Sequence, residues 1–175
     1  MVHIRPVTEA DFSTITEIYG HHVLHGLASF ETEPPSTAEM IERWRANVTK
    51  GLPYLAATMD DRLAGYAYAA PYRHRPAYRF SVENSVYIAP EMAGHGIGRA
   101  LLSALITACE QAGYRQMIAI IGDSANDAST GLHAALGFTP TGILRGVGFK
   151  AGRWVDSVIM QKRLGDGETT LPDGT

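Results

Sequence analysis

The segment SVYIAPEMAGHGIGRALL, residues 85–102, joins a short apolar run, a proline, three glycines and the start of a helical pattern. The glycines at 94, 96 and 98 leave backbone N–H groups accessible because no side chain intervenes. The first N–H groups of a helix lack partners and carry the positive end of its dipole. This order predicts a site for a phosphate or pyrophosphate, with an ordinary tight turn as the alternative.

The residues after the turn predict an amphipathic helix from 97 to 113. A polar stripe at helical spacing faces an apolar one that includes the single cysteine, Cys109, which we expect to be buried. Outside this unit, strands are expected at 2–5, 53–59, 63–70, 82–88, 117–121, 138–149 and 155–161, and helices at 8–25, 36–50 and 124–137. The order of these elements predicts an α/β domain (α+β by some schemes) around a mixed sheet.

Composition limits the possible functions. The chain has 175 residues, 45% of them hydrophobic, and a formal net charge of −3. We expect one domain over residues 1–164 and a flexible Gly-, Pro- and acid-rich tail over 165–175. The charge gives no basic footprint for nucleic acid, and no apolar run is long enough to predict a membrane span. The N-terminal residues lack the pattern of a signal peptide, and a single cysteine fits a reducing compartment, so we expect a cytoplasmic protein.

Two nucleotide motifs do not match the glycine turn. A dinucleotide fingerprint needs G-x-G-x-x-G, but here the spacing is G-x-G-x-G and Arg99 occupies the place of the third glycine. A P-loop needs G-K-S or G-K-T, which this chain lacks. The pyrophosphate of coenzyme A is the remaining candidate ligand.

With these residues in view, VYIAP-x₅-GIGRALL resembles the acetyl-CoA motif of the GNAT N-acetyltransferase superfamily. The stretches SFETEP (29–34), YRHRPAYR (72–79), VENSVY (82–87), GLHAALGF (131–138) and GFKAGRW (148–154) are similar to phosphinothricin and methionine sulfoximine N-acetyltransferases. The resemblance runs from about residue 4 to 164. It implies the GNAT fold, a mixed twisted sheet of about seven strands flanked by about four helices, with acetyl-CoA as co-substrate and a homodimer.

The resemblance also implies a set of cofactor-binding residues. One position departs from the motif, because Ala93 stands where Gln or Arg is usual, and His95 or Arg99 could supply the missing charge. Asn126 and Ser129 match the N-x-x-S that contacts the pantetheine arm or acetyl carbonyl, although Asn126 could be only a helix cap. The full implied set is Val86, Tyr87, Ile88, Ala93, Gly94, His95, Gly96, Ile97, Gly98, Arg99, Asn126 and Ser129.

Glu83 is the first candidate catalytic residue. It shares one strand face with Ser85 and Tyr87, and without the resemblance it could be a carboxylate at a wet strand end. By resemblance it is the general base that removes the amine proton, and a pKa raised by burial would suit that task. His133 matches a functional histidine of the family, as a second base or a substrate hydrogen-bonder, and the alternative is a structural histidine.

The loop before Glu83 is rich in Arg and Tyr and is either solvated or a substrate site. An acidic amino acid analogue needs cations, and Arg binds carboxylate and phosphinate bidentately. By resemblance Arg73, Tyr78, Phe30 and Glu83 bind the substrate. Glu31 stands where some relatives have Arg, which leaves the anion preference open.

These features predict an N-acetyltransferase that acts on the α-amino group of a small acidic amino acid analogue by direct attack in a ternary complex. The alternatives are an acetyltransferase for another small amine or a protein N-terminus, and a non-catalytic acyl-CoA-binding sensor. The cluster His21, His22 and His25 lacks a third ligand on one face, so we expect no metal. The general acid for the thiolate stays open, because solvent could suffice.

Overall fold

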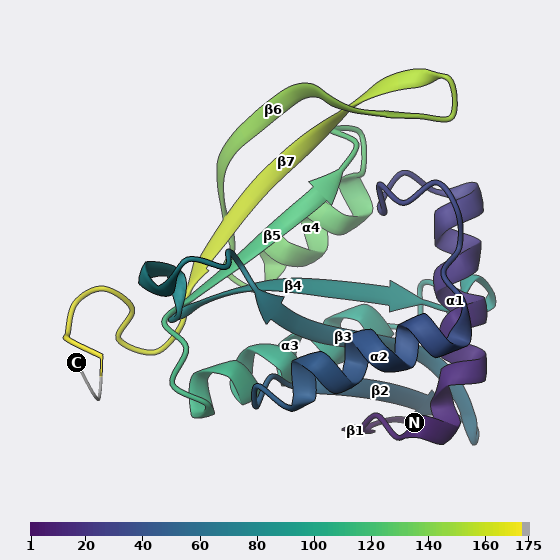
Figure 1. Ribbon diagram of the computed structural model, residues 1–175, viewed down its shortest axis with the longest axis horizontal. Helices are drawn as coiled ribbons and strands as arrows, with labels where there is room; N and C mark the ends of the chain where they lie inside the picture. The colour runs from purple at the N-terminus through teal and green to yellow at the C-terminus, as the bar shows by residue number, and fades with distance from the viewer. Residues whose placement is uncertain (173–175) are drawn as a thin grey trace.

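The computed structural model of the chain describes residues 1–172. Seven strands form one sheet in the order β1-β2-β3-β4-β5-β7-β6, and four α-helices and three short 3-10 turns accompany it (Figure 1). The strands are β1 Val2–Pro6, β2 Tyr54–Met59, β3 Arg62–Pro71, β4 Ser81–Ile88, β5 Gln116–Gly122, β6 Thr139–Lys150 and β7 Arg153–Arg163. The helices are α1 Phe12–His25, α2 Thr37–Val48, α3 Ile97–Gln111 and α4 Asp127–Ala135, and the 3-10 turns are η1 Glu9–Asp11, η2 Pro76–Tyr78 and η3 Pro90–Met92. The predicted mixed α/β sheet is confirmed.

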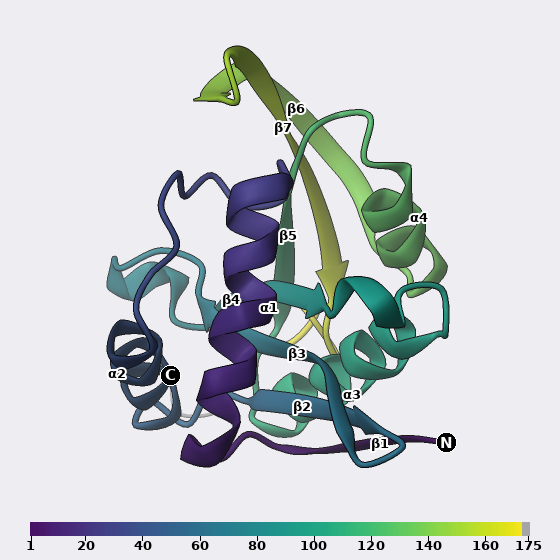
Figure 2. The same cartoon turned by 90° about the vertical axis from the view of Figure 1, so that its right-hand side faces the viewer.

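The helices cover both faces of the sheet. Figure 2 shows α1 and α2 on one side and α3 and α4 on the other. The first face carries the rings of Tyr54, Tyr66, Tyr68 and Tyr87, and Tyr19 of α1 packs edge-on against Tyr87 at 5.0 Å. The second face buries the apolar stripe of α3, including the fully buried Cys109. Burial of Cys109 is therefore confirmed.

The start of the first helix differs from the prediction. The sequence pattern predicts a helix from residue 8, but Thr8 caps the short turn η1 and α1 begins at Phe12. The Asp11 carboxylate accepts the Thr8 N–H at 2.7 Å and pairs with Arg5 at 2.6 Å. A capping box thus forms as the sequence indicates, but the first turn that it closes is a 3-10 turn.

The sheet directions position the site. Five neighbouring strand pairs are antiparallel, whereas β4 and β5 run parallel and pair over residues 81–84 and 116–119. Beyond Asn84 and Ala119 the two strands separate while each keeps its other neighbour. The long β6–β7 hairpin projects past the helices at the top of Figure 1.

Among residues 1–172, every helix is too short or too polar to cross a membrane. Residues 165–171 of the predicted tail contact the domain, since Arg115 donates to the Thr170 hydroxyl at 3.0 Å and Gln116 to Glu168 at 3.0 Å. The boundary at 164 and the flexibility of the tail stay predictions, and residues 173–175 lie outside the described part of the chain.

Candidate active site

A cleft of about 590 Å³ opens where β4 and β5 separate. Its walls come from residues 84–88 of β4, residues 119–122 of β5, the first turns of α4 and the C-terminal end of α1. Loss of pairing on one side of β4 leaves backbone groups that a bound molecule can satisfy. A long amide-containing ligand can therefore lie between the two strands as an added strand.

The backbone of β4 presents these groups in a fixed pattern. The Ala89 N–H donates to the Ala64 carbonyl on the β3 side at 2.9 Å. Because backbone groups alternate in direction along a strand, those of Val86 and Ile88 point toward the cleft. The Ile88 carbonyl accepts a hydrogen bond from His22 Nε2 at 2.8 Å. Val86 lies beyond the last β4–β5 pair, so its N–H and its carbonyl are the groups that this strand can offer to a ligand.

The glycine turn lies next to this cleft. Gly94 and Gly96 have φ of 81° and 75°, a backbone region that favours glycine, and Gly96 is the N-cap of α3. A Cβ on Gly98 would lie 3.3 Å from Leu132, a residue of the cleft wall, so Gly98 lets the helix start approach the cleft. The free N–H groups of this helix start are placed to meet an anion.

The predicted polar residues of the turn are exposed. His95 Nδ1 lies 3.0 Å from the Ala93 carbonyl oxygen, so its ring folds back on the turn. Arg99 extends from the first turn of α3 and is exposed, as are Ala93 and Gly94. The glycine turn is therefore accessible to solvent. The contacts of these residues with a cofactor stay predictions.

Asn126 caps α4, as the simpler sequence interpretation proposed. Its Oδ1 accepts the Ser129 N–H at 3.1 Å. Both residues also line the cleft. The cap uses the amide oxygen, so the two N–H donors of the Asn126 amide are the groups that it can offer to a ligand.

Glu83 lies half-buried near the start of β4, beside the point where the strands separate. Burial raises the pKa of its carboxyl, and the positive charge of Arg73 lowers it by a smaller amount. The net upward shift moves Glu83 toward the range that suits a general base. The structure also brings Arg73 within electrostatic reach of Glu83, and the predicted contact of Arg73 with a substrate stays a prediction.

His133 is only 4% exposed and lines the cleft. Its Nδ1 lies 2.8 Å from the Ser129 carbonyl oxygen and its Nε2 lies 3.0 Å from Asn84 Oδ1. Burial lowers the pKa of His133, and the hydrogen bond to Ser129 opposes this shift. Asn84 in turn donates to the Ile118 carbonyl at 3.2 Å, so His133 is tied to both separating strands.

The two predicted catalytic side chains therefore lie on opposite faces of β4. Adjacent strand residues point to opposite faces, Glu83 toward the face of α1 and α2, and Asn84 toward His133. Both ring nitrogens of His133 already have partners within the protein. His133 lines the cleft whereas Glu83 does not, and which of the two receives the amine proton stays a prediction.

Phe30 lies at the end of the sheet. A Cβ added to Gly148 of β6 would come within 2.5 to 2.9 Å of three of its ring carbons, and one on Gly122 of β5 would lie 3.0 Å from another. The ring thus rests on backbone that lacks side chains, while Phe30 remains 41% exposed. Because Gly122 lines the cleft, Phe30 stands at its end, in a position consistent with substrate contact.

The loop of residues 72–79 carries the other two predicted substrate contacts. Tyr78 stacks edge-on against Tyr72 at 5.7 Å, and the Arg73 guanidinium lies over the Tyr72 ring at 5.2 Å. Tyr78 is exposed. The aromatic contacts orient Arg73 and Tyr78 through one shared ring, and their role in substrate binding stays a prediction.

Comparison with known proteins decides the family. The description "Acetyltransferase (GNAT) domain" matches residues 4–159. The chain belongs to this family. The predicted superfamily and its fold are therefore confirmed.

Individual relatives of this GNAT chain are similar along nearly all of its length. It is 55% identical to phosphinothricin N-acetyltransferase of Alcaligenes faecalis, over 97% of this chain and 86% of that protein. It is 39% identical to L-methionine sulfoximine/L-methionine sulfone acetyltransferase of Salmonella typhimurium, over 97% and 98%. The crystal structure of a phosphinothricin acetyltransferase from Sinorhizobium meliloti in complex with AcCoA aligns with a TM-score of 0.96 at 46% identity, over 99% of this chain and 95% of that one.

His22 is a cleft residue of this GNAT domain that the sequence interpretation missed. It was considered only as part of a histidine cluster, but it hydrogen-bonds β4 and lies 5.5 Å from the Tyr87 ring. Its place three residues after the buried Tyr19 and four after the buried Ile18 was the available signal. Within residues 1–172, no group of three His, Cys, Asp or Glu side chains could hold a metal ion.

Proposed function

We propose that the protein transfers an acetyl group from acetyl-CoA to the α-amino group of a small amino acid analogue such as phosphinothricin or methionine sulfoximine. The observation that carries the proposal is the cleft between β4 and β5, with the start of α3 beside it and Glu83 one residue before Asn84, the first β4 residue of its wall. The similarity to two enzymes with these substrates, and to a structure with bound AcCoA, supports the same chemistry here.

The chain's own groups would hold acetyl-CoA in three places. The N–H groups at Gly96, Ile97 and Gly98 would bind the pyrophosphate. The Val86 backbone would pair with the amides of the pantetheine arm, and the Asn126 amide would donate to it. Acetyl-CoA would supply the activated acetyl group, and these residues would hold its pyrophosphate and pantetheine arm along the cleft.

Glu83 would take the proton of the substrate ammonium group, directly or through a water, so that the free amine can attack the thioester carbon. A backbone N–H of β4 at the cleft would stabilise the negative charge that develops on the carbonyl oxygen. The tetrahedral intermediate then releases the thiolate of CoA; the amide nitrogen gives its second proton to solvent, and solvent can protonate the thiolate. Cys109 is buried and burial raises the pKa of its thiol to about 12, which supports direct transfer over an acyl-enzyme.

His133 would act as a positioning residue in this scheme. It connects α4 to Asn84 at the point where the strands part, and so fixes the inner end of the cleft. A role as second base requires one ring nitrogen to leave its present neighbour, either the Ser129 carbonyl oxygen or Asn84 Oδ1.

We also propose that the protein is a cytoplasmic homodimer. The β6–β7 hairpin exposes a group of large apolar side chains that a second copy could cover: Ile143, Leu144, Val147, Phe149 and Trp154. Trp154 is 69% exposed. Light scattering after size exclusion, with Trp154→Glu as the variant expected to give monomers, tests this assembly.

A panel of amino acids with acetyl-CoA, read as free CoA released, tests the activity. Release with phosphinothricin or methionine sulfoximine supports the proposal. Release only with other amines or with peptide N-termini favours an acetyltransferase of different specificity. Binding of acetyl-CoA without release for any amine indicates a sensor.

A further inference from the structure

The residue before Phe30 is held by two side chains from distant parts of the chain. The Ser29 carbonyl accepts a hydrogen bond from Lys150 Nζ of β6 at 2.6 Å. The Ser29 hydroxyl lies 2.9 Å from the Tyr19 hydroxyl of α1. Ser29 and Lys150 are both buried, so this side of the loop is fixed within the protein.

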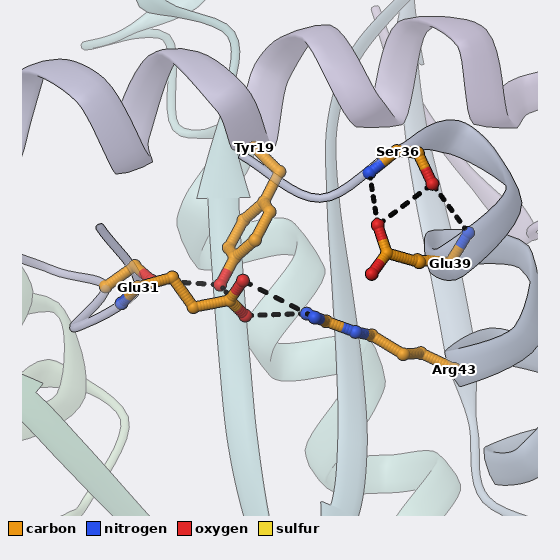
Figure 3. A network of polar contacts seen from close by, with 6 residues as sticks. Tyr19, Glu31, Ser36, Glu39 and Arg43 are labelled. Atoms are coloured by element: carbon orange, nitrogen blue, oxygen red, sulfur yellow. Dashed lines mark hydrogen bonds and ion pairs between the residues drawn. The ribbon is translucent and has the colours of Figure 1, made fainter. Parts of the chain in front are cut away.

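The residue after Phe30 is held from the other side (Figure 3). Arg43 of α2 donates to the two carboxylate oxygens of Glu31 at 2.6 and 3.4 Å. The Tyr19 hydroxyl donates to the same carboxylate at 2.9 Å. Figure 3 shows the Glu31 carboxylate turned toward Tyr19 and Arg43, so its charge is already paired.

Residues on both sides of Phe30 are thus fixed by α1, α2 and β6, and the ring itself rests on Gly148. A partly exposed ion pair such as Glu31–Arg43 adds little to global stability. The effect on ligand affinity is different from the effect on stability. A loop side chain that is already ordered loses no further conformational entropy when a ligand binds, so its ordering strengthens binding.

We propose that the Glu31–Arg43 ion pair, together with the Tyr19 hydroxyl that contacts Glu31 and Ser29, is a positioning device that orders Phe30 for binding of the amino acid substrate. The proposal rests on the proposed acetyltransferase function for the identity of that substrate. In this proposal the attraction between the two side chains orders the loop, so a variant with Arg at position 31 and Glu at position 43 should order it as well. Tyr19 permits the exchange because a hydroxyl can donate to a carboxylate or accept from a guanidinium.

The same helix provides a matched control. Arg45 of α2 pairs with Glu9 of η1 at 2.7 Å, and both side chains are exposed. This pair joins α2 to the start of the chain and does not involve the loop around Phe30. Removing the charge of Glu9 tests the general effect of losing an ion pair on α2.

The experiment compares Glu31→Gln, Arg43→Gln, the exchange variant E31R/R43E and the control Glu9→Gln. With phosphinothricin as the varied substrate, Glu31→Gln and Arg43→Gln should each raise KM roughly five-fold. The KM for acetyl-CoA and kcat should stay within about two-fold, and the exchange variant should recover to within about two-fold of the parent. Glu9→Gln should match the parent.

Chymotrypsin cleavage after Phe30 gives a readout that does not need activity. Cleavage should be faster in both single variants than in the parent, and the exchange variant should restore protection. The proposal is overturned if the exchange variant is as impaired as the single variants, or if cleavage and KM match those of Glu9→Gln. A parent protein that acetylates no amino acid refutes the proposed function, while the cleavage rates still decide whether the pair orders the loop.

Discussion

Replacing Gly148 with alanine should displace Phe30 from the end of the sheet. The new Cβ would lie 2.5, 2.9 and 2.9 Å from three carbons of the Phe30 ring, closer than atoms can pack. Gly148 does not have a positive φ, so the change introduces the clash without backbone strain. The flexible partner of the clash is the ring, and we expect it to swing into solvent.

The structure sets the size of the effect. Full burial of a phenylalanine side chain stabilises by about 1.5–3 kcal/mol. Phe30 is 41% exposed, so loss of its remaining contacts should cost about 1–2 kcal/mol. For a chain of this length, that corresponds to a fall in melting temperature of about 2–8 °C.

Gly142→Ala on the same strand is the control, because its added Cβ would meet no atom within 4 Å. Melting curves and the KM for phosphinothricin should both change in Gly148→Ala and stay near the parent values in Gly142→Ala. In a Phe30→Ala background the effect of Gly148→Ala should disappear. Equal behaviour of the two glycine variants would refute the packing of Phe30 on Gly148.

Three substitutions and one labelling experiment test further parts of the structure. Glu83→Gln should lower kcat by about 10²–10⁴; the loss should be smallest at high pH, where the amine is already free, and an unaltered pH–rate profile would contradict the role of Glu83 as base. Arg73→Ala should raise the KM for the amino acid by a factor that corresponds to about 1.5–3 kcal/mol. Since Arg73 lowers the pKa of Glu83, the same change should move the acidic limb of the kcat/KM profile to higher pH, and a rise in the KM for acetyl-CoA instead would place the loop at the cofactor site. Gly96→Val should raise the KM for acetyl-CoA strongly, because a φ of 75° favours glycine and a branched side chain would block the N–H groups at the start of α3. An unchanged KM in the folded variant would exclude pyrophosphate binding at this turn. Cys109 should react with iodoacetamide in urea but hardly in the native protein, as its thiol is buried with a pKa raised to about 12, and fast native labelling would contradict this.

Local patterns were enough to predict the elements of the fold. The apolar stripe of α3 repeats at helical spacing, and all of its predicted members, from Leu101 to Cys109, are buried. Ser36 and Glu39 form the capping box that starts α2. Helical periodicity and capping depend only on residues a few positions apart, so they can be recognised in a single sequence.

The geometry of the candidate site depends on contacts between distant residues. Lys150 and Ser29 are 121 positions apart, and nothing local to either residue indicates their hydrogen bond. The glycines at 122 and 148 offered a partial signal, because glycine inside a strand often marks close approach of another segment. The separation of β4 from β5 has no local signal, since it depends on where pairing stops.

The parting of β4 and β5 also divides the sheet mechanically. Strands β1 to β4 form one leaf and β5, β7 and β6 the other, with the two leaves joined by the short pairing at residues 81–84. A molecule that pairs with the free edge of β4 and contacts β5 braces the leaves against each other. Binding of a ligand in the cleft should therefore slow amide hydrogen exchange in β7, far from the contacts, as well as in β4. The two leaves should then unfold more cooperatively.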